Sequence, residues 1–308
     1  MRERQAGGLP PEISVGGTTA ACERIFMKTG IVMEGGAMRG MFTAGVIDVL
    51  MENDISFDGG VGVSAGAVFG CNLKSRQHGR VIRYNLKYCR DWRFASMRSL
   101  ITTGTLYGAE FCYTEIPYKL DLFDIPAYRK NPMEFYCGCT DMETGKAVFR
   151  HLKKGDGEDL YWFMASASMP IVSEPVKIRH WKLLDGGISD SIPLRFLEDK
   201  GYDRNLVVLT QPYNFVKKPN KALPLIRRVY KDYPALINAV ATRHMRYNRE
   251  RAYIKSRAAS GDAFIICPPE PLRIGSTEHD PRELIRVYDI GRQTMLEELP
   301  ALKEFLNK

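Results

Sequence analysis

Residues 60–66 of the chain read Gly60-Val61-Gly62-Val63-Ser64-Ala65-Gly66, and the last five form a G-x-S-x-G pattern. The residues before Ser64 predict a short buried strand, and the small residues after it predict a helix start. A sharp turn from strand to helix needs glycine on both sides, because a Cβ atom there would clash. The turn would lift the serine hydroxyl out of the sheet edge, beside the positive end of the helix. The alternative is a Gly-rich turn with a capping serine.

The same order of elements occurs earlier in the chain. Residues 29–33 predict a buried strand, residues 34–40 form a Gly-rich turn, and apolar residues from Phe42 to Leu50 recur at helical spacing. A strand, turn and helix that occur twice in succession indicate parallel α/β winding. We therefore expect an α/β fold with a largely parallel sheet.

The remaining chain continues this pattern without an internal repeat or an interdomain linker. Residues 1–26 are rich in Gly, Thr and Pro and predict a flexible leader, and residues 27–308 predict one domain. Residues 74–132 predict helical or irregular structure. Further strands are predicted at 135–140, 146–150, 178–184, 206–210 and 264–267. Apolar residues within 233–244 mark one face of a long basic helix, and a final helix is predicted at 282–299.

Composition places the chain among ordinary globular proteins. Of its 308 residues 44% are hydrophobic and 26% are charged, and the longest apolar runs are no longer than a strand. No run approaches the roughly 20 apolar residues of a spanning helix, and no signal-peptide core is evident. The seven cysteines are scattered, which favours free thiols in a reducing compartment. We expect a cytoplasmic protein.

The net charge of +8 is concentrated in two segments. Residues 74–98 contain eight Lys or Arg against one acid, and residues 225–257 contain nine against two. Such segments either form solvated faces or bind an anionic partner, which would be lipid head groups or nucleic acid.

The turn Gly35-Gly36-Ala37-Met38-Arg39-Gly40 follows the first predicted strand. Exposed backbone N–H groups in such a turn can bind the oxyanion that forms during ester hydrolysis. The rival interpretation is a dinucleotide-binding loop. Ala37 departs from that pattern, and Asp54 precedes the second strand instead of ending it.

Asp185 ends a predicted strand and is followed by Gly186 and Gly187, which leave room for close approach to its carboxylate. An aspartate beside a hydroxyl can accept its proton, and burial would raise its pKa toward the useful range. The alternative is an ordinary Asp-Gly turn. A Ser–Asp–His triad in chain order would use His244 or His279, but the first fits an apolar helix face and the second a loop.

Three motifs stand in one order, Glu34–Gly40, Gly62–Gly66 and Asp185–Gly187. This set resembles the patatin-like phospholipases, and most closely the bacterial patatin-like proteins. Ala165–Pro170 with Glu174-Pro175, and Asp190–Pro193, resemble family segments on either side of the aspartate. The resemblance covers about residues 30–300.

The resemblance implies a single three-layer domain with helices on both faces of the sheet. It implies a serine acyl-ester hydrolase with a catalytic dyad of Ser64 as nucleophile and Asp185 as proton acceptor. Gly35, Gly36 and Ala37 would supply the oxyanion N–H groups, and no metal or cofactor is required. Ala37 stands where the family usually has glycine, so a positive φ there would cost on the order of 1 kcal/mol. Glu34 stands where plant members carry aspartate.

The expected substrates are acyl esters of lipids, as for a phospholipase A, a lysophospholipase or a carboxylesterase. Arg39 would orient a phosphate or another part of the substrate, or form a salt bridge in the scaffold. We expect peripheral contact with an anionic membrane and no nucleic-acid partner. The alternatives are an α/β-hydrolase with a Ser–Asp–His triad and a non-enzymatic membrane-binding protein on the same scaffold.

Overall fold

The computed structural model describes residues 27–307, so the predicted leader lies outside the described residues. Eight strands form one sheet in the order β5-β6-β3-β2-β1-β7-β8, with β4 paired to β3. The parallel strands are β1 (Lys28–Met33), β2 (Gly59–Val63), β3 (Glu134–Asp141), β7 (Tyr202–Val208) and β8 (Ala263–Ile266). The antiparallel strands are β4 (Ala147–His151), β5 (Val176–Ile178) and β6 (Trp181–Asp185).

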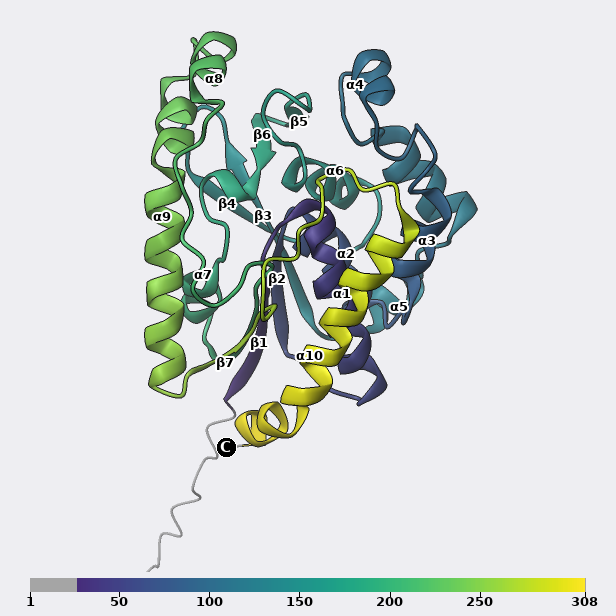
Figure 1. Cartoon of the computed structure of the whole chain (residues 1–308), viewed down its shortest axis with the longest axis vertical. Helices are drawn as coiled ribbons and strands as arrows, with labels where there is room; N and C mark the ends of the chain where they lie inside the picture. Colours follow the sequence, from purple (N-terminus) through teal and green to yellow (C-terminus); the bar gives the residue numbers. More distant parts are fainter. Residues whose placement is uncertain (1–26, 308) are drawn as a thin grey trace, which may run out of the picture.

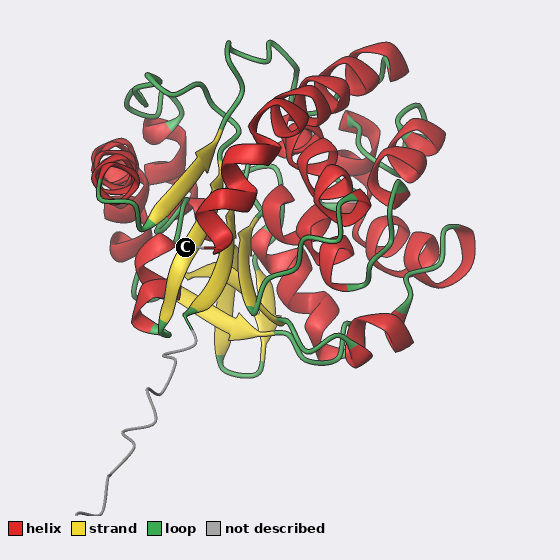
Figure 2. Cartoon of the chain, turned by 90° about the horizontal axis from the view of Figure 1, so that it is seen from below, coloured by secondary structure: helices red, strands yellow, loops and turns green. Residues whose placement is uncertain are grey.

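Helices cover both faces of this sheet (Figures 1 and 2). The longer ones are α1 (Gly40–Glu52), α2 (Ala65–Lys74), α3 (Arg80–Tyr88), α6 (Glu158–Ser166), α9 (Pro234–Ala259) and α10 (Pro281–Asn307). The shorter ones are η1 (Ala37–Arg39), α4 (Met97–Thr103), the π-helical η2 (Phe111–Leu120), α5 (Ile125–Lys130), η3 (Gly186–Ile188), α7 (Leu194–Asp199) and α8 (Leu223–Val229). No helix within residues 27–307 combines the length and the apolar character that crossing a bilayer requires.

The central strand β1 shows why the molecule has three layers. Its side chains alternate, so Ile31 and Met33 join one hydrophobic core while Val32 joins another. The first core includes residues of α1, α2, α6 and α10, and the second includes residues of α7 and α9. Strands that are buried on both faces have continuous apolar sequences, and residues 29–33 follow this pattern. The predicted three-layer α/β fold is confirmed.

Two predicted elements differ from the structure. The single strand expected at residues 178–184 is a hairpin, in which the chain reverses at Arg179 and His180 between β5 and β6. Arg179 has a φ of 54°, a turn conformation that its sequence neighbours do not signal. The last helix extends to Asn307, beyond the expected end at residue 299, and it passes through Pro300.

The basic segment at residues 74–98 does not form one cationic face. The Lys74 ammonium is buried and donates to the carbonyl oxygens of Asn131 and Met133. Arg80 is also buried, and its guanidinium forms an ion pair with Asp121. Two of the eight basic side chains are therefore structural, because they are buried and contact groups of the protein itself.

Candidate active site

The register of the sheet brings Ser64 and Asp185 to the same place. Val63, the last residue of β2, pairs with Gly138 of β3, and Cys139, the next residue of β3, pairs with Asp185. The serine that follows β2 and the aspartate that ends β6 are thus held on either side of β3. Both residues line the same cavity.

Ser64 occupies the sharp turn between β2 and α2 that the glycine pattern predicts. Its backbone has a φ of 55° and a ψ of −127°, a conformation that L residues rarely adopt. A Cβ atom on Gly66 would lie 2.1 Å from the carbonyl oxygen of Met33, and one on Gly62 would lie 2.4 Å from that of Gly66. Only glycine fits at these two positions, because the turn packs directly against β1 and its own helix.

Asp185 is 2% exposed, and its two carboxylate oxygens differ in their surroundings. Oδ1 accepts a hydrogen bond of 2.7 Å from the Gly187 N–H group. Oδ2 is buried and has no hydrogen-bond partner among residues 27–307, although the Ser64 hydroxyl is near enough to influence the carboxyl. A free lone pair beside a serine hydroxyl suits a proton acceptor, and such contacts often tighten only when substrate binds.

Burial raises the pKa of Asp185 above its ordinary value. The neighbouring Ser64 hydroxyl and then the Arg243 guanidinium oppose this shift by stabilising the charged form. The net direction is upward, which brings the carboxylate closer to the range where it can accept a proton from a serine.

A small-residue segment at the end of α6 connects Ser64 to Asp185. The Ser64 N–H group donates to Ser166 Oγ at 2.8 Å, and this hydroxyl in turn donates to the carbonyl oxygen of Gly138 at 2.6 Å. Two residues later, the Ser168 carbonyl accepts from the Asp185 N–H group at 2.7 Å. One segment therefore fixes the backbone of both residues relative to β3.

The turn between β1 and η1 runs beside Ser64. A Cβ atom on Gly35 would lie 2.7 Å from Ser64 Cβ, so only glycine allows this approach. In the described chain, the N–H groups of Gly35, Gly36 and Ala37 donate to no carbonyl or side chain. Three free N–H groups next to a serine can hold an oxyanion. Ala37 has a φ of 49°, the left-handed conformation in which a third glycine would be at ease.

Glu34 anchors this turn from inside the protein. It is 2% exposed, and its carboxylate accepts from the Thr210 N–H group and from the Tyr247 hydroxyl, both at 2.7 Å. Thr210 Oγ1 also donates to the Gly35 carbonyl at 3.1 Å. The longer side chain of glutamate thus reaches from the turn to the segment just after β7 and to α9.

No histidine of the described chain lines either of the two cavities that include Ser64. His279 Nδ1 contacts the Cys89 carbonyl, and the buried Nδ1 of His244 has no partner among the described residues. This arrangement favours a dyad over the alternative triad.

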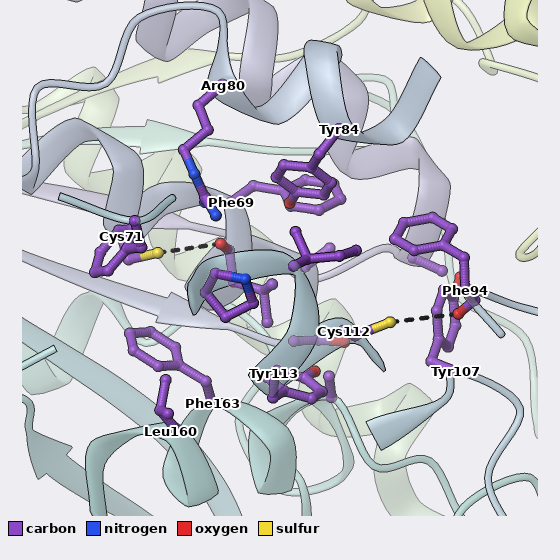
Figure 3. Close-up of a pocket in the computed structure, with 18 of the residues that line it drawn as sticks. Phe69, Cys71, Arg80, Tyr84, Phe94, Tyr107, Cys112, Tyr113, Leu160 and Phe163 are labelled. Carbon is purple, nitrogen blue, oxygen red and sulfur yellow. Dashed lines mark hydrogen bonds between the residues drawn. The ribbon is translucent and has the colours of Figure 1, made fainter. Parts of the chain in front are cut away.

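The first of the two cavities is almost entirely apolar (Figure 3). It has a volume of about 140 Å³ and extends from Ser64 between α2, η2 and α6. Aromatic and aliphatic side chains point into it, among them Phe69, Tyr84, Tyr113, Leu160 and Phe163. Such a lining suits a hydrocarbon chain.

The second cavity shares Ser64 with the first and is cationic. Arg39, Lys217 and Arg243 line it together with Ser64 and Asp185. Arg39 was a sequence candidate, whereas Lys217 and Arg243 were not. The only signal for Arg243 was its place in the basic segment at residues 225–257.

Two arginines of α9 hold the loop that follows Asp185. Arg243 Nε donates to the Gly187 carbonyl, and Arg246 donates to the carbonyls of Ile188 at 2.9 Å and Ser189 at 3.2 Å. The basic segment is therefore divided, because these two side chains point inward at the candidate active site while Arg227, Arg228 and Arg249 are exposed.

Comparison with known proteins agrees with this architecture. A family model described as patatin-like phospholipase matches residues 31–197, and a domain of unknown function (DUF6363) matches residues 233–307. The uncharacterized protein YjjU of Escherichia coli is 28% identical over 282 residues, which cover 86% of this chain and 75% of that protein. Lysophospholipase nte1 of Aspergillus niger is 28% identical over 182 residues, which cover 57% of this chain but only 11% of that protein.

Two solved structures show a distant likeness. VipD from Legionella pneumophila has a TM-score of 0.46 and 12% identity, with 89% of this chain and 67% of that chain covered. The type III effector ExoU has a TM-score of 0.43 and 12% identity, with 92% and 54% covered. The family model spans more than half of the sequence and contains the serine turn, the Gly-rich turn and the aspartate. The chain belongs to the patatin-like phospholipase family.

Proposed function

We propose that the protein hydrolyses acyl esters of lipids, as a phospholipase A or lysophospholipase, through a Ser64–Asp185 dyad. The observation that carries this proposal is the position of Ser64 at the junction of an apolar and a cationic cavity. An amphipathic ester placed across this junction would have its acyl chain on one side of the nucleophile and its polar head on the other. The name of the fungal relative, lysophospholipase, agrees with such a substrate.

The reaction proceeds in two steps. Ser64 Oγ attacks the ester carbonyl carbon while Asp185 Oδ2 takes the hydroxyl proton, and the carbonyl oxygen becomes an oxyanion held by the N–H groups of Gly35, Gly36 and Ala37. Asp185 then returns the proton to the leaving alcohol as the C–O bond breaks. Water, activated by the same carboxylate, hydrolyses the acyl-enzyme and restores Ser64.

We further propose that α4 and α8 bring this site to an anionic membrane. The two helices project at the same end of the molecule, on either side of the β5–β6 hairpin (Figure 1). Ile101 of α4 is 81% exposed, and Val229 of α8 is 54% exposed. Exposed arginines accompany them, namely Arg98, Arg227 and Arg228. Apolar tips with basic neighbours suit a surface of anionic lipid.

A labelling and kinetic experiment tests the dyad. A fluorophosphonate probe should label the wild type and not Ser64→Ala. On a short nitrophenyl ester, Ser64→Ala and Asp185→Asn should each lower kcat/KM by at least about 10³-fold, because they remove the nucleophile or its base. The matched variants His244→Ala and His279→Ala should stay within about threefold of wild type, since neither side chain lines the cavities. A loss with either histidine variant in folded protein would favour the triad instead.

A further inference from the structure

Strand β4 forms an open edge of the sheet. It pairs with β3, and no other strand within residues 27–307 pairs with it. At one end of this ladder the Leu152 N–H group donates to the Phe135 carbonyl at 2.8 Å. At the other end the Asp141 N–H group donates to the Lys146 carbonyl at 3.0 Å. Because bonded and non-bonded residues alternate along an antiparallel ladder, the even-numbered residues of β4 bond to β3.

The backbone groups of the odd-numbered residues of β4 point away from β3. These residues are Ala147, Phe149 and His151. In the described part of the chain their N–H groups donate to no acceptor, and their carbonyl oxygens accept from no donor. A row of free donors and acceptors along a sheet edge is a template for the addition of another strand.

A groove crosses this edge. Phe149 and His151 line it from one face of β4, and Arg150 lines it from the other face. Phe196 of α7 and Glu158 of α6 extend the groove on these opposite faces of the sheet. The Phe149 and Phe196 rings are stacked, with centroids 4.1 Å apart. Because both faces contribute side chains, the groove exposes the edge of β4 together with an aromatic surface.

The carboxylates of the groove are already engaged within the protein. Six Lys or Arg side chains line the groove against three carboxylates. Asp156 forms an ion pair with an arginine of α5, and Glu158 forms one with Arg179. Asp159 accepts from the backbone N–H groups of Lys154 and Gly155. The groove therefore has an excess of positive charge.

Three lysines carry this excess, namely Lys153, Lys154 and Lys200. All three are exposed, and none of them forms an ion pair with a carboxylate of residues 27–307. Lys200 Nζ lies 5.9 Å from the centroid of the Phe196 ring and 6.0 Å from that of Tyr136. Acidic side chains of an added strand would pair with these ammonium groups, beside the aromatic surface.

We propose that β4 binds an extended acidic segment of a partner protein, which joins the sheet as a further strand. Its backbone pairs with the odd-numbered residues of β4, and its acidic and apolar side chains contact the lysines and the aromatic surface. A second copy of this chain fits poorly, because two cationic grooves would face each other. A nucleic acid also fits poorly, because the outward carbonyl oxygens of β4 would repel its phosphates.

This site goes beyond the proposed hydrolysis. The groove shares no lining residue with either of the two cavities that include Ser64. Peptide binding at β4 is therefore measured without any ester substrate, and its outcome is independent of the proposed function.

Fluorescence anisotropy with a labelled peptide of alternating Glu and Val tests the strand addition. The matched variants are His151→Ala and His151→Pro, which both lose the imidazole. Only proline removes the outward N–H group, and it leaves the bonds to β3 intact. His151→Pro should bind the peptide about three- to tenfold more weakly than His151→Ala, because one backbone hydrogen bond is lost. A proline at the centre of the peptide should also weaken binding to the wild type. Equal binding of the proline and valine peptides, or of the two folded variants, would overturn the inference.

A double variant tests the charge of the groove. Lys153→Gln together with Lys200→Gln should weaken peptide binding by about three- to tenfold, because two exposed ion pairs are lost. The control combines Lys119→Gln with Lys303→Gln, two exposed lysines that do not line the groove, and should stay within about twofold of wild type. Equal loss in both double variants would mean that the peptide responds only to net charge, and the groove would not be its site.

Amide hydrogen exchange followed by NMR locates the contact. The peptide should slow exchange of the Ala147, Phe149 and His151 amides by at least about tenfold, and change little at Val148 and Arg150, which already bond to β3. Unchanged exchange at the three outward amides with peptide bound would contradict strand addition. If an oligothymidylate displaces the peptide and binds His151→Pro and His151→Ala alike, the groove is a nucleic-acid site and the inference is wrong.

Discussion

Ser64 and Ala37 both hold backbone conformations that their side chains disfavour, with φ angles of 55° and 49°. Each such residue costs of order 1–3 kcal/mol, and it persists only where the surrounding packing imposes it. Around Ser64 that packing comes from Gly62, Gly66 and the end of β1. Ser64 lines both cavities in this strained conformation, which suits its proposed role as nucleophile. The strain at Ala37 differs, because glycine at this position would adopt the same backbone conformation without strain.

We therefore expect Ala37→Gly to leave the free energy of unfolding unchanged or to raise it by up to about 1 kcal/mol. Relief of the left-handed conformation is offset in part by the greater entropy of glycine in the unfolded chain. The control is Ala252→Gly at an exposed position within α9, which should lose about 1 kcal/mol. Urea denaturation measures both variants. If Ala37→Gly and Ala252→Gly lowered the free energy of unfolding equally, Ala37 would not be strained.

The raised pKa of Asp185 predicts the acidic side of the pH profile. In the proposed mechanism Asp185 accepts the Ser64 proton only when it is deprotonated, and burial favours the protonated form. For a neutral nitrophenyl ester, kcat/KM should fall about tenfold per pH unit below a midpoint that lies above about 4, the ordinary value for aspartate. A midpoint at or below 4, in protein that circular dichroism shows to be folded, would speak against a buried Asp185 as the base.

At the scale of elements, α4 and α8 combine short length, apolar tips and basic neighbours. Met97 and Ile101 of α4 are 63% and 81% exposed, and the Arg98 guanidinium lies 4.3 Å from the centroid of the Trp92 ring. Isolated exposed apolar residues are common on proteins, but here exposed apolar side chains lie on two helices that project at the same end of the molecule (Figure 1).

Replacement of Met97 and Ile101 by serine should weaken binding to vesicles that contain phosphatidylglycerol by at least about tenfold, because each side chain loses burial in lipid worth about 1.5–3 kcal/mol. Hydrolysis of a dissolved short ester should not change. The matched control replaces Ile285 and Leu296 of α10, which are 40% and 48% exposed, by serine. Co-sedimentation with vesicles measures binding. Equal loss in both double variants would show that α4 is not the contact.

At the scale of the whole molecule, the apolar cavity is assembled from segments that are far apart in the chain. Val68 comes from α2, Ile116 from η2, and Leu160 from α6. Its volume of about 140 Å³ is close to that of an engineered cavity of about 150 Å³ that binds benzene. The cavity therefore encloses about six carbons of a bound acyl chain.

Nitrophenyl esters of increasing length test this cavity. From acetate to about the octanoate, kcat/KM should rise by about fourfold per methylene, since each buried methylene contributes about 0.8 kcal/mol. Val68→Phe, which fills the cavity, should abolish the rise while hydrolysis of the acetate remains. Leu296→Phe on the surface of α10 adds a similar ring elsewhere and should keep the wild-type series. A rise that persists in Val68→Phe would place the acyl chain outside this cavity.

The sequence by itself determined the features whose physical cause lies within a few residues. Glycines at positions 35, 62 and 66 are required because a side chain at each would collide with adjacent backbone or Ser64, and the residue pattern already indicated both turns. The continuous apolar run at residues 31–33 likewise predicted a buried strand. The hairpin at Arg179 escaped prediction because no glycine or proline marks its left-handed turn.

Only the tertiary structure decided how these pieces act together. Register across β3 brings Ser64 and Asp185 to one cavity, and packing of α9 turns Arg243 and Arg246 inward while Arg249 on the same helix stays exposed. The sequence did not single out Lys217, because the local sequence around a lysine does not show whether its side chain is exposed or lines a cavity. Burial, charge neighbours and cavity walls depend on residues distant in the chain, so no local pattern records them.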